Sequence, residues 1–492
     1  MVNNSCNSQT SNRNKIITPG AWNITPPLTK SVFFEEPLLV FANEETTYDP
    51  KVGIPLYGPR FKNTSRHRSE IHVAMIGRPE DCENVKNGIQ KWAEGVDGSN
   101  DQTPFPGFSS DHTFHASLIF EESKSGLITR QEEREFMETK RKKEGFEKLL
   151  QIVEFKLKAL FEERDNPPSI VFFVVGEEMF KAYNAIKFMS GRRLYSRNLR
   201  RAFKVLAMKY KATSQILRPS TFLNDSKVRR TDHPSRSAWN LFTGIYYKAS
   251  GPAWTPAMVD SNVCHVGISF YRPSDSNNQL RTSIAQAFDE TGEGIILRGN
   301  SFHWDEKAQG KSPHLSRDQA SALLNQVIEQ FKIHHSGQIP SHIIVHKSSR
   351  FEPEERIGFE DAIRGKVNKY DLVALQTTGN VRLVRQGKYP PARGTSFTIG
   401  DNHYLYTRGY LPTERTYPHA HVPSPLQIAD HTGDSSVSEI LQSMMVLTKL
   451  NQNTADFCGL LPITLRFSRL VADILREANY DDIIRPQFKY YI

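Results

Sequence analysis

The segment PPSIVFFVVG (167–176) is an almost continuous apolar run bounded by proline and glycine. Such a run is typical of a central parallel strand that is covered on both faces. Working outward, IHVAMIG (71–77) precedes a helical pattern, and a second apolar segment (115–120) precedes a charged helical pattern at about 131–164. This charged pattern predicts one long solvated helix with a single buried stripe. Alternating strands and helices predict a doubly wound α/β domain in the first half.

The stretch that follows this strand is strongly basic. No acidic residue lies between Glu178 and Asp225, whereas eleven basic residues do, which exceeds the net charge of +9 of the whole chain. A local excess of this kind is typical of phosphate binding. The basic residues are Lys181, Lys187, Arg192, Arg193, Arg197, Arg200, Arg201, Lys204, Lys209, Lys211 and Arg218.

Part of this stretch has helical periodicity. Leu199, Phe203, Leu206, Ala207 and Tyr210 recur at helical spacing and are expected to face a core. The opposite face carries mainly Arg and Lys, without acidic residues three or four positions away to neutralise them. A basic helix face is usually solvated, but the missing acidic partners favour a bound phosphate here.

Length and composition limit the remaining possibilities. A chain of 492 residues predicts about two to four domains. The apolar runs are too short to span a membrane and no signal peptide opens the sequence, so we expect a cytoplasmic protein. Residues 1–32 are polar and predict a flexible leader. The four cysteines lack zinc or disulfide spacing and are expected to be reduced: Cys6, Cys82, Cys264 and Cys458.

Two segments, NLRRAFKVLAMKYKATSQ (198–215) and NLFTGIYYKASGPAW (240–254), resemble the guide 5′-end pocket in the MID-PIWI half of Argonaute proteins. By position in the motif, the four places of that pocket fall to Arg200, Lys204, Gln215 and Lys248, with Arg200 standing where many members have Tyr. The resemblance also implies that the terminal carboxylate of Ile492 helps to hold a divalent cation, Mg²⁺, between the first guide phosphates.

Five later segments resemble the RNase H-like sheet and closing helices of the PIWI domain. They are CHVGISFYRP (264–273), HIIVHKSSRFEPEE (342–355), PSPLQIADHTG (423–433), ILQSMMVLTKLNQN (440–453) and LPITLRFSRLVADIL (461–475). The expected architecture is therefore α/β, with a Rossmann-like MID domain (33–258) followed by an RNase H-like PIWI domain (259–492).

The resemblance does not extend to a nuclease site. Such a site needs several carboxylates to hold two divalent ions. By motif position, Ser269 replaces the first aspartate, Ser348 or its neighbour Ser349 the second, and Arg469 the last ligand. Neutral hydroxyls cannot offset the charge of two metal ions, so we expect no nuclease activity. The alternative is a guided endonuclease that uses displaced acidic ligands such as Asp289, Glu290 or Glu293, although Glu293 also fits an ordinary turn.

Three further groups leave two interpretations open. His419 and His421 form an H-x-H pair that fits a metal site less well than an exposed loop. His346, Lys347 and Arg350 fit either phosphate contacts or ordinary loop charge. Trp254 and Tyr247 fit either a core or a nucleotide-stacking surface.

Too few residues precede Phe33 for the additional N-terminal domains of long Argonautes, so the chain resembles a short prokaryotic Argonaute. This resemblance implies a sensor in prokaryotic antiviral defence that binds a guide, usually RNA, and pairs it with invading single-stranded DNA. The expected partner carries an APAZ domain fused to an effector, either a TIR or sirtuin-like NADase or a nuclease. Together they would form a heterodimer that causes abortive infection, through NAD depletion where the effector is an NADase. A nucleic-acid-binding protein without a guide is the simplest alternative, and it would not prefer a 5′-phosphate.

Overall fold

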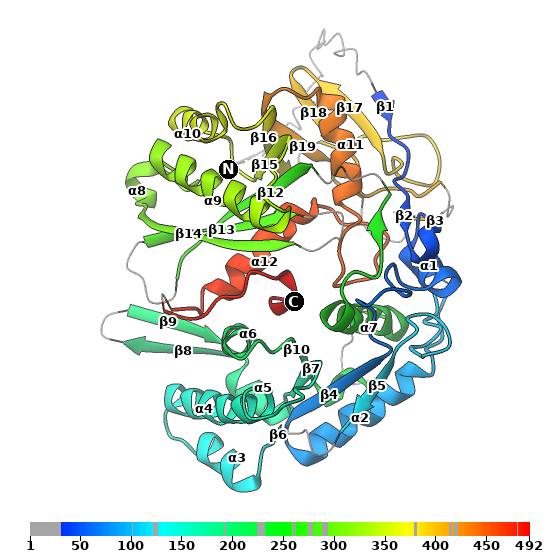
Figure 1. Cartoon of the computed structure of the whole chain (residues 1–492), viewed down its shortest axis with the longest axis vertical. Helices are drawn as coiled ribbons and strands as arrows, with labels where there is room; N and C mark the ends of the chain where they lie inside the picture. Colours follow the sequence, from blue (N-terminus) through cyan, green and yellow to red (C-terminus); the bar gives the residue numbers. More distant parts are fainter. Residues whose placement is uncertain are drawn as a thin grey trace, which may run out of the picture.

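The structure is a computed structural model. It describes residues 31–492 except 101, 122–125, 191–192, 224–231, 258–259, 261, 274–278, 288–293, 378–380, 413–415, 418–421 and 480. The described chain forms two units, each built around its own sheet, with the end of the chain lying between them (Figure 1). Almost all of the predicted leader falls outside the described residues. The strand β1 (Ser31–Phe33) begins at its last positions.

The first unit contains a parallel sheet in the order β10-β7-β4-β5, with β6 also paired to β4. All five residues of β7 are buried, and β7 lies between two neighbours, which confirms the predicted central strand. The strands are β4 (Glu70–Gly77), β5 (Ser117–Phe120), β6 (Gly126–Leu127), β7 (Ile170–Val174) and β10 (Ser214–Leu217).

Helices cover both faces of this sheet because successive strand residues point to opposite sides. Phe172 and its alternate neighbours pack with α2 (Pro79–Ala93) and α7 (Pro234–Ser250). Phe173 packs on the other face, with the group formed by α3 (Arg130–Met137), α4 (Lys142–Phe161), α5 (Glu177–Tyr183) and α6 (Leu199–Lys209). The doubly wound arrangement predicted for the first half is therefore present.

The predicted long helix at about 131–164 is wrong, because two helices, α3 and α4, occupy that range. The chain turns back after Met137, and the Phe136 carbonyl then lies against Gly145. A Cβ on Gly145 would approach that carbonyl oxygen to 2.6 Å. In one straight helix these residues would be about 13 Å apart along the axis. Packing of Phe136 and Phe146 around Tyr183 therefore decides the break.

The second unit is built on a mixed sheet in the order β1-β17-β18-β19-β16-β15-β12-β13-β14. Strands β12, β15 and β16 run parallel, and the other pairs are antiparallel. The strands are β12 (Val263–Tyr271), β13 (Gln279–Ala287), β14 (Ile295–His303), β15 (His342–Lys347), β16 (Lys369–Thr377), β17 (Thr395–Ile399), β18 (Asn402–Leu405) and β19 (Leu426–Gly433).

Helices also cover both faces of this sheet. One face packs on α9 (Arg317–His334) and α10 (Pro353–Ile363), preceded by the short α8 (Glu306–Gln309). The other face packs on α11 (Val437–Leu447) and α12 (Ile463–Leu475). Helix α12 approaches β12 closely because Gly267 has no side chain, and a Cβ there would lie 2.2 Å from the Thr464 carbonyl oxygen.

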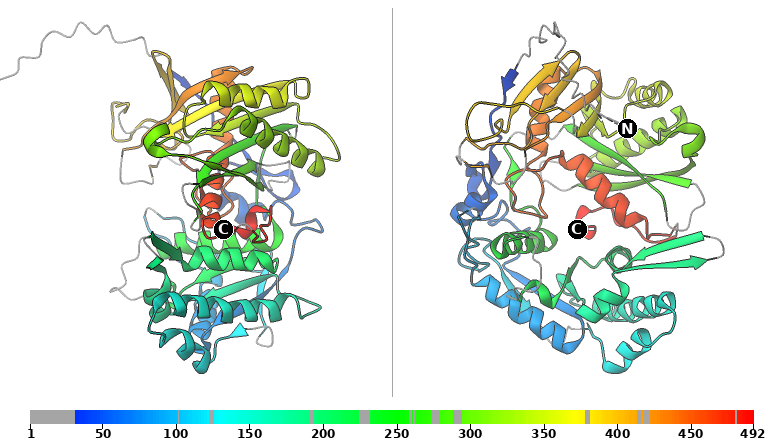
Figure 2. Two further views of the ribbon diagram at one scale, coloured as in Figure 1. Left: turned by 90° about the vertical axis from the view of Figure 1, so that its left-hand side faces the viewer. Right: turned by 180° about the vertical axis from the view of Figure 1, so that it is seen from behind.

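Smaller elements join the two units. A small sheet in the order β11-β2-β3 combines β2 (Leu39–Val40), β3 (Thr46–Thr47) and β11 (Thr255–Pro256), next to α1 (Pro50–Tyr57). A two-stranded ribbon of β8 (Ala185–Ser190) and β9 (Arg193–Asn198) projects from the first unit, as the right-hand view in Figure 2 shows. Single 3₁₀ turns are η1 (Ala42–Glu44), η3 (Pro219–Thr221) and η4 (Phe488–Tyr490). No described helix is long and apolar enough to cross a membrane.

Helix α6 has two buried faces, whereas its sequence pattern predicts one. Phe203 and Ala207 pack in the first unit as expected. Val205 and Met208 pack instead with residues of α12 and with Tyr491 near the chain end. Part of the helix face that was predicted to be basic and solvated therefore contacts the second unit instead.

Candidate nucleic-acid interface

Helix α6 directs two of the predicted pocket residues toward the end of the chain. The helix begins after Asn198, whose side chain accepts a hydrogen bond of 3.2 Å from the Arg201 backbone N–H. Arg200 and Lys204 are four residues apart, so they lie one above the other on the same side of the helix. That side faces Tyr491 and Ile492.

Lys204 is almost fully buried, with 2% of its surface exposed. Its Nζ donates to the Ser214 carbonyl oxygen at 2.6 Å and also to the terminal carboxylate of Ile492. Burial, and then the nearby charges of Lys248 and Arg200, lower the pKa of Lys204 well below its usual value. A second anion at this position would therefore be strongly favoured.

Lys248 stands on the last turn of α7 and donates to the side-chain oxygen of Gln215. Its exposure is only 1%, and burial followed by the Arg200 charge lowers the pKa of Lys248 to about 7. Gln215 keeps its amide nitrogen on the Ile216 carbonyl at 3.2 Å. This low pKa shows that no nearby negative charge among the described residues stabilises the Lys248 ammonium. A bound phosphate would supply such a charge and keep the lysine protonated.

Arg200 completes the group from α6. Its guanidinium donates to the Tyr491 carbonyl oxygen at 3.4 Å, and burial lowers its pKa. The structure thus brings together all five residues predicted for the pocket: Arg200, Lys204, Gln215, Lys248 and Ile492.

The tail that carries Ile492 is held along its length. The Phe488 N–H donates to the Gly294 carbonyl at 3.3 Å, and the Tyr491 hydroxyl donates to the Arg485 carbonyl at 2.9 Å. Tyr491 and Ile492 are both buried. The terminal carboxylate therefore has a fixed position in the pocket.

Four other cations of the basic stretch pair with acidic side chains, which corrects the prediction of an uncompensated basic face. Their acidic partners belong to distant elements, α4, α5 and the end of α12, and helical spacing cannot reveal them. The pairs are Arg197 with Glu147 (2.8 Å) and Glu477 (2.5 Å), Arg201 with Asp473 (2.5 Å), Lys209 with Glu154 (2.5 Å) and Arg218 with Glu177 (2.6 Å). On α6, only Arg200 and Lys204, which face the tail, have no ion pair with an Asp or Glu side chain among the described residues, so these two remain suited to a phosphate.

Two of the positions compared with a nuclease site lie near the C-terminal ends of two central strands of the second sheet, β12 and β15. Ile268 pairs with Lys347, so Ser269 and Ser348 follow at the same end of two neighbouring parallel strands. Arg469 is on α12, which packs across β12. Within the described residues, no three His, Cys, Asp or Glu side chains form a group that could hold a metal. Asp289, Glu290 and Glu293 lie outside the described residues, as do His419 and His421.

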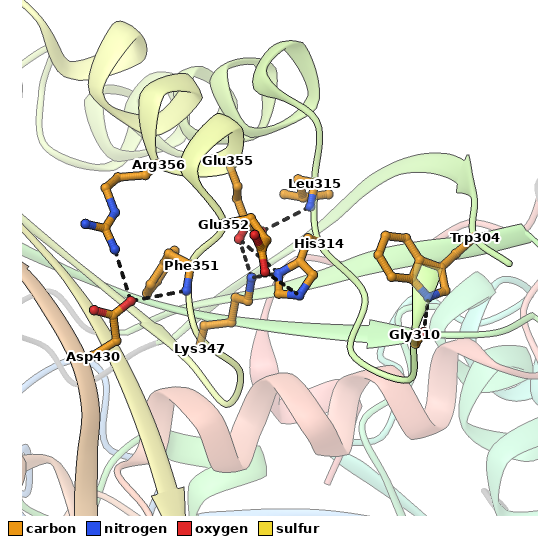
Figure 3. A network of polar contacts seen from close by, with 10 residues as sticks. All are labelled: Trp304, Gly310, His314, Leu315, Lys347, Phe351, Glu352, Glu355, Arg356 and Asp430. Carbon is orange, nitrogen blue, oxygen red and sulfur yellow. Dashed lines mark hydrogen bonds and ion pairs between the residues drawn. The ribbon is translucent and has the colours of Figure 1, made fainter. Parts of the chain in front are cut away.

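Two of the three residues considered for phosphate contacts are buried structural groups. Lys347 bonds to Glu355, and its Nζ lies 3.2 Å from His314 Nδ1 (Figure 3). The Leu315 N–H donates to Glu355 at 3.1 Å, so this carboxylate accepts hydrogen bonds from both Lys347 and the backbone. His346 is likewise buried, with Nδ1 2.9 Å from the Thr464 hydroxyl. Only Arg350 is exposed.

Trp254 and Tyr247 are also core residues rather than a stacking surface. Trp254 is 1% exposed, and its indole N–H donates to the Lys449 carbonyl at 3.1 Å. Tyr247 packs in the apolar core that joins α7 to the second unit.

A cavity of about 450 Å³ between the units escaped the sequence reasoning. It is lined by Lys51, Arg236, Arg408 and Asp456, among others. Arg236 pairs with Asp456 at 3.1 Å, whereas the buried Nε of Arg408 has no hydrogen-bond partner in the described chain. The next residues along that loop add an aromatic pair, because Tyr410 stacks on Tyr389 with 4.6 Å between ring centroids. Arg385 lies 5.3 Å from the Tyr410 ring. The residues that line the cavity come from segments far apart in the sequence, so no local pattern indicated it.

We compared the sequence and the structure with those of known proteins. No protein-family model matches the chain, and no curated protein matches it by sequence. Solved structures do match. The Argonaute of Clostridium butyricum, bound to a guide DNA and a 19-mer target DNA, is 15% identical with a TM-score of 0.61, covering 91% of this chain and 53% of that one. Drosophila Piwi is 10% identical with a TM-score of 0.57, covering 94% and 56%. Aa-Ago with externally bound siRNA is 13% identical with a TM-score of 0.56, covering 94% and 56%.

The chain thus spans about half the length of these proteins. The likeness shows the fold, and it confirms the predicted Rossmann-like MID domain followed by an RNase H-like PIWI domain.

Proposed function

We propose that the protein binds a small guide RNA by its 5′ end and pairs it with single-stranded target DNA. The observation that carries this proposal is the pocket formed by Lys204, Lys248 and the terminal residue Ile492. Its cations are buried, come from two helices and are only partly compensated. A 5′-phosphate supplies the missing negative charge.

Each pocket residue has a distinct part in this proposal. Lys204 and Lys248 would donate charge-assisted hydrogen bonds to the phosphate. Arg200 stands where a planar guanidinium can bind two phosphate oxygens or cover the first base. Gln215 offers a neutral amide. These contacts fix the position of the guide without reading its sequence.

A Mg²⁺ ion fits this pocket only together with the guide. The terminal carboxylate of Ile492 and the carbonyl oxygen of Gln215 are hard oxygen donors of the kind that Mg²⁺ prefers. Few donors come from the protein, and Mg²⁺ commonly takes one carboxylate plus substrate phosphates. The ion would neutralise repulsion between the Ile492 carboxylate and the first guide phosphates.

Beyond the pocket, the cavity around Arg408 supports a path for the strand. Its cations would contact the phosphate backbone, and base pairing would supply sequence specificity. We further propose that the chain does not cut its target, because Ser269, Ser348 and Arg469 stand where metal ligands are needed. The response to a target would then come from a partner protein that carries an APAZ domain fused to an effector. We propose that this effector is a TIR or sirtuin-like NADase.

The test is equilibrium binding of a 20-nucleotide RNA with a 5′-phosphate or a 5′-hydroxyl. We expect tighter binding of the phosphorylated RNA, and Lys204→Met with Lys248→Met should weaken it at least 100-fold, because two charge-assisted hydrogen bonds are lost. Lys209→Met, on the same helix but paired with Glu154 at the surface, is the control. Equal binding of both RNAs by a folded wild-type protein would contradict the proposal.

A further inference from the structure

The β8–β9 ribbon projects away from the sheet of the first unit (Figure 1). Among the described residues its two strands pair only with each other. A strand without a second neighbour presents unpaired N–H and C=O groups along its outer edge. Strand β8 lies on the side of the ribbon that contacts α4.

The two faces of the ribbon differ. Ile186 is buried against the unit, and Phe188 stacks on Tyr195 with 5.6 Å between ring centroids. Met189 and Leu194 are directly opposite each other in the register, yet they are 61% and 60% exposed. An exposed cross-strand pair of this size is an uncovered apolar contact.

A groove of about 770 Å³ runs between β8 and the first turns of α4. Its acidic residues are already bound, because Glu144 pairs with Arg141 at 3.2 Å and Glu147 with Arg197 at 2.8 Å. Several lysines have no ion pair among the described residues. The lining consists of Arg141, Lys142, Lys143, Glu144, Glu147, Lys148, Gln151, Lys187, Phe188 and Met189.

We propose that this groove binds an extended acidic segment of a partner protein, which adds to the free edge of β8 as a third strand. Main-chain hydrogen bonds to β8 would give affinity, and alternate side chains would give specificity. Carboxylates of the segment would meet Lys142 and Lys148 of α4, while an apolar side chain on the other face of the added strand would cover Met189. The six residues of β8 offer an edge of about 20 Å.

A protein segment fits this groove better than a nucleic acid. A phosphate backbone would use the lysines but leave Met189 and Leu194 exposed. Stacking of bases on Phe188 is blocked, since the ring is covered by Tyr195 and by the Lys143 ammonium 5.0 Å from its centroid. The combination of lysines, an apolar pair and a free edge therefore selects an acidic strand.

The test uses the full chain and a fluorescent decapeptide of alternating Glu and Val, measured by anisotropy. We expect saturable micromolar binding that falls at least tenfold in the variant Lys142→Glu with Lys148→Glu. Lys158→Glu, on the same helix but outside the groove, should bind as the wild type does. A decapeptide with N-methyl groups on every second residue should lose binding in one of its two registers, since only one edge of an added strand faces β8.

Other outcomes would overturn the inference. Equal binding of the peptides methylated in either register would exclude strand addition. Absence of peptide binding, or displacement of the peptide by a 5′-hydroxyl DNA 12-mer, would exclude a protein segment as the occupant. The groove lies outside the guide pocket, so Lys204→Met with Lys248→Met should leave peptide binding unchanged. Failure of this inference is therefore distinguishable from failure of the proposed guide binding.

Discussion

Lys204 and Ile492 are 288 residues apart in the chain, and the Lys204 ammonium donates a hydrogen bond to the terminal carboxylate of Ile492. Lys204 belongs to the first unit, whereas Ile492 ends a tail held by the second. The proposed pocket therefore exists only when the two units are docked. Its shape depends on the apolar contacts of Val205 and Met208 with α12 and the tail.

Extension of the chain beyond Ile492 should damage the pocket. Ile492 is 4% exposed, so three added residues (Gly-Ser-Gly) have no room without displacing the carboxylate. We expect affinity for 5′-phosphorylated RNA to fall at least tenfold in the binding assay. The same three residues inserted after Met1 provide the control. Unchanged affinity of the extended protein would show that the carboxylate is not part of the site.

The sequence predicted the identity of the pocket residues because each sits at a fixed place in an ordered motif. Lys204 follows Arg200 by one helical turn, and Lys248 closes a second helix. The central strand was equally clear, since a run such as Ile170–Val174 is buried on both faces.

Sequence patterns could not predict which residues from distant parts of the chain pair with one another. Nothing local shows that Glu477 reaches Arg197 or that Asp473 reaches Arg201, so the basic stretch looked less compensated than it is. For the same reason Lys347 looked like a loop cation, although strand alternation turns it inward onto Glu355. The break between α3 and α4 depends on Tyr183, which is far along the chain.

Guide affinity should depend on pH. Burial lowers the pKa of Lys248 to about 7 in the free protein, and a bound phosphate would raise it, because an opposite charge favours the ammonium. Binding then takes up a proton above pH 7, so affinity should fall as pH rises from 7 to 9, by at most about tenfold per unit for one group. Titrations at constant ionic strength would measure this, and Lys248→Met should flatten the profile. A flat wild-type profile would contradict a role for Lys248 in phosphate binding.

Lys248→Met should also stabilise the free protein. The pKa of Lys248 is depressed on folding, so the unfolded chain binds more protons above pH 7 and wild-type stability rises as pH rises toward 10.5. Replacing a poorly compensated buried charge by an apolar side chain commonly adds about 1–3 kcal/mol near neutral pH. Urea unfolding at pH 7 and pH 9.5 would show a larger gain at pH 7. A variant less stable than the wild type at both pH values would show that the lysine is well compensated.

Glu36 should be a stability residue that ties the start of the described chain to the second unit. It accepts from Arg393 at 2.7 Å and from Lys449 at 2.8 Å, and both cations are buried. Burial alone would raise the pKa of Glu36, but Arg393 and Lys449 lower it overall. Its contribution is therefore present above pH 4.5 and is lost as pH falls through the lowered pKa.

Glu36→Gln should cost about 3–5 kcal/mol of unfolding free energy, because it leaves two buried cations without their carboxylate. The neighbouring Glu35 is exposed, and Glu35→Gln should change stability by less than about 0.5 kcal/mol. Chemical unfolding at pH 7 compares the two variants. Similar stabilities would mean that Arg393 and Lys449 find other partners.

The purified protein, loaded with guide RNA and given Mg²⁺ or Mn²⁺, should leave a fully paired DNA target intact on a denaturing gel. Two-metal cleavage needs carboxylates where Ser269 lies near the end of β12 and Ser348 follows β15, and hydroxyls do not hold two divalent ions. Arg469 on α12 adds a positive charge on the same side of the sheet. Cleavage at a single phosphodiester would contradict this prediction and would favour displaced acidic ligands. In that case Asp289→Asn, Glu290→Gln and Glu293→Gln, tested one at a time, would show which carboxylate replaces the missing aspartates.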